Sequence, residues 1–125
     1  MPRGCNDSTK AQTRGRAAEA LAARFLEEHG LQVVERNFRV RGGEIDLVCR
    51  DGKTLVFVEV RLRSHPSFGG AAASITSAKR QRLILAARHY LLRATDSDCR
   101  FDAILLNQLA EDAIDWIKNA FAADD

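Results

Sequence analysis

Two apolar segments, residues 44–49 and 54–63, constrain the fold most, because each is typical of a buried β-strand. Asp51-Gly52 lies between them, and this dipeptide between apolar runs is a strong signal for a β-hairpin turn. Charge inside a buried strand is costly unless a partner compensates it. The charged residues of the two segments nonetheless include Glu44, Asp46, Glu59 and Arg61.

A two-residue turn at 51–52 would fix which residues of the hairpin lie opposite one another. Glu44 would then face Glu59, and Asp46 would face Phe57. Because side chains alternate along a strand, the four charged residues would share one face, with Asp46 and Glu59 as diagonal neighbours. A three-residue turn with a bulge would shift the register by one residue and scatter them.

Such a cluster of charge would be energetically significant. Two carboxylates about 6 Å apart repel by roughly 3 kcal/mol at an effective dielectric constant near 20. Arg61 offsets only one negative charge, whereas a divalent cation would neutralise the remainder. Hard oxygen ligands on a rigid hairpin suit Mg²⁺ or Mn²⁺. The alternative is that these residues lie on an edge strand, where water solvates them without consequence.

The rest of the chain predicts an α/β domain in which a mixed β-sheet is flanked by helices. The polar segment 1–12 is expected to be a disordered tail, and 13–125 to form one domain. The expected elements are a helix over 13–29, strands over 31–40, 44–49 and 54–63, a mobile loop over 64–75, a helix over 76–93 capped by Thr76, a strand over 99–107, and a strand or helix over 112–121. This is the order αβββαβ with one optional further strand.

Length and composition favour one soluble domain. The chain has 125 residues, of which 46% are hydrophobic and 29% charged. We find no long apolar run and no secretory leader, so we expect a cytoplasmic protein with no membrane partner. Cys5, Cys49 and Cys99 form no CxxC motif, which argues against a zinc cluster or a disulfide framework.

The distribution of charge suggests a polyanionic partner, although a scattered basic surface is also common in proteins that bind nothing. Residues 1–93 hold 17 Lys or Arg against 9 Asp or Glu, whereas residues 94–125 hold 2 against 8. Cations in the first turns of the second predicted helix oppose its dipole, and a bound phosphate would compensate them. The alternative to a bound phosphate is that these long cationic side chains extend into solvent. The expected nucleic-acid contacts are Lys79, Arg80, Arg82, Arg63 and His65.

The segments "GGEIDLV" and "LVFVEVRLR" resemble the YraN-like family of small bacterial proteins. This resemblance extends over nearly the whole chain, through "RGRAAEALAARFL", "KRQRL", "CRFD" and "IDWI". More broadly, the sequence resembles the PD-(D/E)xK nuclease superfamily, especially archaeal-type Holliday junction resolvases. That wider match depends on Asp46, the triplet at 59–61 and the αβββαβ order.

The resemblance implies a restriction-endonuclease-like fold and a set of site residues. Asp46 and Glu59 would hold the metal, with the backbone carbonyl of Val60 as a further ligand. Glu19 resembles an extra acidic residue that some resolvase-like enzymes bring to the site, although a plain surface glutamate is an equal alternative. Arg61 replaces the usual lysine, and arginine keeps its proton, so electrostatic help would survive but proton abstraction would not.

We therefore expect a nucleic-acid-binding protein, more specifically a metal-dependent DNA endonuclease that uses Mg²⁺ or Mn²⁺. One alternative is a non-catalytic nucleic-acid-binding module that uses the same surface. Another is a protein-interaction factor in which the acidic cluster is structural, and a homodimer is left open in each case. The candidate catalytic residues are Asp46, Glu59, Arg61, Glu19 and Glu44.

Overall fold

The computed structural model describes residues 7–62, 75–93 and 98–122 of the chain. Its helices and strands are α1 (Asp7–Glu28), β1 (Gln32–Val40), β2 (Gly43–Asp51), β3 (Thr54–Leu62), α2 (Ser77–Leu91), β4 (Cys99–Leu106) and β5 (Ile114–Phe121), with a short 3₁₀ helix at Glu111–Ala113. The predicted αβββαβ order is confirmed. The last segment, which the sequence left open, is a strand.

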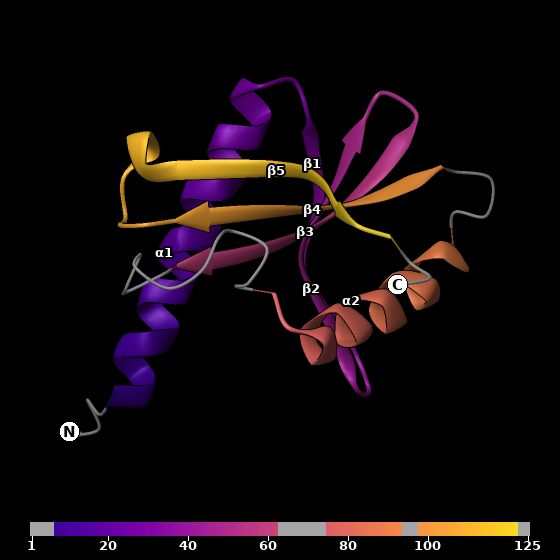
Figure 1. Ribbon diagram of the computed structural model, residues 1–125, viewed down its shortest axis with the longest axis horizontal. Helices are drawn as coiled ribbons and strands as arrows, with labels where there is room; N and C mark the ends of the chain where they lie inside the picture. Colours follow the sequence, from indigo (N-terminus) through magenta and orange to yellow (C-terminus); the bar gives the residue numbers. More distant parts are fainter. Residues whose placement is uncertain (1–6, 63–74, 94–97, 123–125) are drawn as a thin grey trace.

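The five strands form one mixed sheet in the order β1-β2-β3-β4-β5 (Figure 1). Strands β3 and β4 run parallel, and the other neighbours run antiparallel. The chain passes from β3 to β4 through α2, as parallel neighbours require. The architecture is an α/β fold consistent with a restriction-endonuclease-like core.

Each helix packs on its own hydrophobic core. Leu26 of α1 belongs to one buried cluster, together with Val58 and Ile104 of the sheet. Leu83 of α2 belongs to the other, together with Phe57. Alternate residues of β3 therefore enter opposite cores, as the alternation of side chains along a strand predicts.

The β2–β3 turn differs from the predicted one by one position. Asp51 pairs with Thr54, so the turn residues are Gly52 and Lys53, and Val48 rather than Asp46 lies opposite Phe57. Gly52 has a φ of 63°, which suits the first turn position of a hairpin that requires positive φ. The predicted register was wrong by two residues. A shift of two keeps the side chains of the paired segment, residues 47–51 and 54–58, on their predicted faces.

Strand β2 bends at Asp46. Ile45 packs in the α2 core and Leu47 in the α1 core, although regular alternation would place both on one side. In the β1–β2 register, the residue opposite Asp46 is Asn37, which has a φ of 54°. Asparagine tolerates this left-handed conformation better than most residues. The unusual backbone of β1 thus coincides with the bend in β2.

Helix α2 lies very close to the start of β2. A Cβ atom on Gly43 would lie 2.5 Å from the backbone oxygen of Arg82, so only glycine permits this approach. The helix begins after Thr76, whose side chain accepts a hydrogen bond of 3.2 Å from the backbone N–H of Lys79. The predicted cap is confirmed. The first turns of α2 are therefore held against β2.

Helix α1 begins at Asp7, earlier than the predicted start at Thr13. The segment 7–12 contains no glycine or proline to prevent a helix, and Asp, Ser and Thr are favoured where helices start. Residues 1–6 of the predicted tail and 64–74 of the predicted loop lie outside the described residues. Among the helices that the structure describes, none is long and apolar enough to cross a membrane.

Candidate functional site

A hollow of about 190 Å³ opens where β2 and β3 lie between the two helices. Its wall brings together the four charged residues of the hairpin, as the shared face predicted. Residues from α1 and α2 complete it. The charged side chains that line the hollow are Glu19, Glu44, Asp46, Glu59, Arg61, Lys79 and Arg82.

Asp46 lies where β2 and β3 separate. The paired ladder of the two strands ends at Leu47 and Val58. Directly beyond it, the Asp46 carboxylate accepts a hydrogen bond of 2.8 Å from the backbone N–H of Val60. A side-chain oxygen therefore replaces the strand partner that this N–H would otherwise need. The side chain is held at the wall of the hollow, and the residue as a whole is 9% exposed.

Burial disfavours ionisation of both carboxyl groups of the Asp46–Glu59 pair. Burial, and next the charge of Glu59, raise the pKa of Asp46 to about 8, although the hydrogen bond from Val60 opposes the shift. Burial also raises the pKa of Glu59, against the opposing charges of Lys79 and Arg61. At pH 7 the pair therefore holds fewer than two negative charges.

Lys79 and Arg82 of α2 form ion pairs with acidic residues of the hollow. Lys79 Nζ lies 3.7 Å from Glu59 Oε2, and Arg82 lies 3.9 Å from Glu44. Glu44 also lies 3.7 Å from Arg39 of β1, so it pairs with arginines instead of facing Glu59 as the predicted register required. Such partly exposed pairs contribute about 0–1 kcal/mol each, so incoming anions or cations can displace them.

Glu19 belongs to the site. Its side chain lines the hollow from α1, and burial raises its pKa against the opposing effect of a hydrogen bond with Asn37. The charge of Glu44 contributes further to the increase. The sequence left this residue as either a site acid or a surface glutamate, and its position in the structure favours the first.

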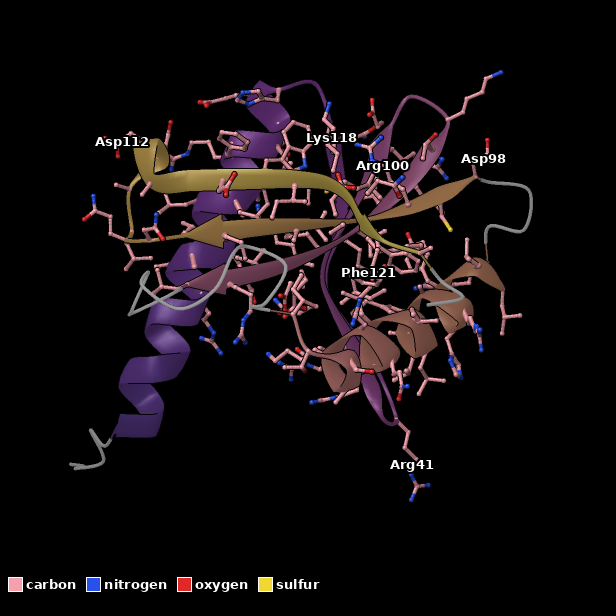
Figure 2. The ribbon with its side chains drawn as sticks, viewed as in Figure 1. Arg41, Asp98, Arg100, Asp112, Lys118 and Phe121 are labelled. Atoms are coloured by element: carbon pink, nitrogen blue, oxygen red, sulfur yellow. The ribbon has the colours of Figure 1, made fainter. Side chains whose placement is uncertain are left out.

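The predicted phosphate contacts separate into three groups. Lys79 and Arg82 line the hollow. Arg80 instead lies 5.9 Å from the ring of Phe121, which is found at the end of β5 beside α2 (Figure 2), and it is absent from the wall of the hollow. Arg63 and His65 lie outside the described residues.

Two residues of β1 reach the acidic residues although no pattern in the sequence predicted it. Arg39 approaches Glu44, and Asn37 contacts Glu19. The predicted strand contained both, but only the packing of α1 and β2 against β1 brings them to the acidic residues. No local pattern in the sequence could have indicated this.

The acidic residues fit a hard divalent cation that retains several waters. Among the described residues, no group of three or more His, Cys, Asp or Glu side chains is arranged to hold a metal ion. A cation would therefore depend on the carboxylates of Asp46 and Glu59, the carbonyl of Val60, and water. Two neighbouring acidic groups on the wall of an open hollow suit Mg²⁺ or Mn²⁺ in this respect, provided that Asp46 releases its proton.

Residues 18–106, which include every charged residue of the hollow, match the profile of the uncharacterised protein family UPF0102. The chain belongs to this family. A UPF0102 protein from Dechloromonas aromatica is 64% identical over 120 residues, which cover 96% of each chain. One from Methylobacillus flagellatus is 61% identical over 109 residues, 87% of this chain and 96% of the relative. The predicted resemblance to the YraN-like family is thereby confirmed.

The raised pKa of Asp46 predicts how the stability of this UPF0102 protein depends on pH. The pKa of Asp46 is about 8 in the folded chain, against 3.8 for an unperturbed aspartate, so the folded state binds the proton more tightly. The proton on Asp46 stabilises the folded state fully below about pH 4, and this stabilisation is lost as the pH rises through 8. In EDTA, Asp46→Asn should remove this loss while retaining an acceptor for Val60. The free energy of unfolding is measured with urea at pH 5 and pH 8. Between these pH values, it should fall by more than about 1 kcal/mol further in wild type than in the variant.

Asp115→Asn is the matched control, because Asp115 is an exposed carboxylate on β5. It should change stability equally at both pH values. Parallel pH curves for wild type and Asp46→Asn would contradict the assignment of this titration to Asp46.

Proposed function

We propose that this protein binds nucleic acid, DNA in particular, and hydrolyses its phosphodiester bonds with Mg²⁺ or Mn²⁺. The observation that carries the proposal is the Asp46–Glu59 pair, two buried acidic residues on the wall of an open hollow. A retained proton and the hydrogen bond between the two acids relieve their repulsion at pH 7, but both groups still lose their hydration on burial, which fold stability alone does not require. A cation shared with a phosphate would remove this conflict.

The residues around the pair support distinct roles. Asp46, Glu59 and the Val60 carbonyl would hold the cation. When bound, the cation supplies a Lewis acid that polarises a phosphate oxygen and lowers the pKa of a water molecule. Arg61 keeps its proton and stabilises the negative charge that develops on the phosphate. Lys79 and Arg82 of α2 supply donors for adjoining phosphates.

A second candidate function is a nucleic-acid-binding module without catalysis. The ion pair between Lys79 and Glu59 favours it, because an amine already compensates one of the two carboxylates. Arg61 favours it too, since it stands where the nuclease superfamily has a lysine. Both candidates use the same surface for binding, and only the first needs the metal.

Substitutions at Arg61 separate the two candidates. If Arg61 stabilises charge, Arg61→Lys should keep or raise metal-dependent cleavage, because lysine supplies the same charge and also positions water. Arg61→Ala should lower the rate about 100-fold, in line with the loss of about 3 kcal/mol for one oxyanion donor. Asp46→Asn should abolish cleavage. The assay follows linear, single-stranded and four-way-junction DNA with Mg²⁺ or Mn²⁺.

Arg88→Ala serves as the control, because Arg88 is an exposed cation of α2 that does not line the hollow. Its cleavage rate should equal that of wild type. If neither wild type nor Arg61→Lys cuts any of the substrates while both bind DNA, the non-catalytic module is the better description.

Substitutions on α2 test where phosphate binds. Lys79→Ala and Arg82→Ala should each weaken DNA binding for every sequence tested and should flatten its salt dependence, because phosphate contacts release counterions without reading bases. Arg80→Ala is the matched control, since Arg80 is next in sequence to Lys79 but packs near Phe121. Fluorescence anisotropy at several salt concentrations measures both quantities. Equal losses for all three variants would contradict the assignment to the hollow.

A further inference from the structure

A second hollow, of about 450 Å³, opens between α1 and β1. It shares Gly15 and Glu19 with the first hollow, so the two meet at this turn of α1. Its other lining residues are Arg16, Asn37 and Arg39. The two hollows are therefore adjacent, the first at the Asp46–Glu59 pair and the second at the edge strand β1.

The second hollow has a surplus of positive charge. Arg16 and Arg39 contribute two guanidinium groups, against the single carboxyl of Glu19, which is hydrogen-bonded with Asn37. The side chain of Arg39 is 71% exposed and lies 3.7 Å from Glu44, an arrangement that leaves it able to turn toward an anion. Planar guanidinium groups bind phosphate through paired hydrogen bonds.

Gly15 lies in the interior of α1, where glycine is unfavourable. Its backbone does not have a positive φ, and a Cβ atom would meet nothing within 4 Å. Neither conformation nor packing within the described residues therefore requires glycine at this position. Since Gly15 lines both hollows, what the missing side chain provides is open space where they join.

We propose that the second hollow binds the phosphate next to the reacting one in a nucleic-acid strand. Arg16 and Arg39 donate hydrogen bonds to this phosphate, and Gly15 leaves room for the strand to pass between the two hollows. The inference rests on the proposed function, and it identifies the path of the strand beyond the Asp46–Glu59 pair.

Binding of fluorescent single-stranded and duplex oligonucleotides in EDTA, measured by anisotropy over a series of salt concentrations, tests this path. Arg16→Ala and Arg39→Ala should each weaken binding several-fold and reduce the salt slope by about one. Gly15→Gln should fill the passage and weaken binding at least tenfold. The same variant should raise the melting temperature by about 2–4 °C, because glutamine is a better helix former than glycine.

Ala20→Gln is the matched control, because Ala20 is an exposed residue of α1 that lines neither hollow. It should leave the affinity unchanged. If wild type binds and both Gly15→Gln and the arginine variants bind equally well, the path is wrong although the proposed function stands. If wild type binds neither oligonucleotide at any salt concentration, the proposed function itself fails, and the path fails with it.

Discussion

The rest of the site depends on the hydrogen bond between the Asp46 carboxylate and the Val60 N–H. This bond forms where β2 leaves β3, so one carboxyl group both ends the ladder and lines the hollow. Asn37, opposite Asp46 on β1, adopts the left-handed backbone at the same level of the sheet. The bend that separates the strands thus also places a buried acid beside Glu59. Burial there, together with the charge of Glu59, raises the pKa of Asp46.

The two helices complete the site with opposite charges. Helix α2 can approach β2 because Gly43 has no side chain, and its first turns carry Lys79 and Arg82 to the hollow. Helix α1 adds Glu19 from the other side, and Gly15 leaves the wall open there. A buried acidic centre with cations around it suits a ligand that brings both a metal ion and phosphates, and the proposal of nucleic-acid cleavage draws on this arrangement.

Local patterns in the sequence predicted the element order and the gathering of the charged residues, which line one hollow. The predicted register was wrong because Asp-Gly permits a turn that begins at either residue. The break in alternation at Asp46, which puts Ile45 and Leu47 in opposite cores, was not predicted. Arg80 was predicted beside Lys79 and Arg82 but lies near Phe121 instead, because helical spacing alone cannot say which side of α2 meets the sheet. The contributions of Asn37 and Arg39 could not be predicted, since α1 and β2 approach β1 only in the folded chain.

The Asp46–Glu59 pair is proposed to bind a divalent cation, and calorimetric titration of the metal-free protein with Mg²⁺ and Mn²⁺ at pH 7 measures that binding. Titrations in two buffers with different ionisation enthalpies count the protons released. Because the pKa of Asp46 is about 8, saturable binding should release about one proton per ion. Asp46→Asn should bind neither metal. Absence of saturable heat in wild type, or equal binding by Asp46→Asn, would contradict the account.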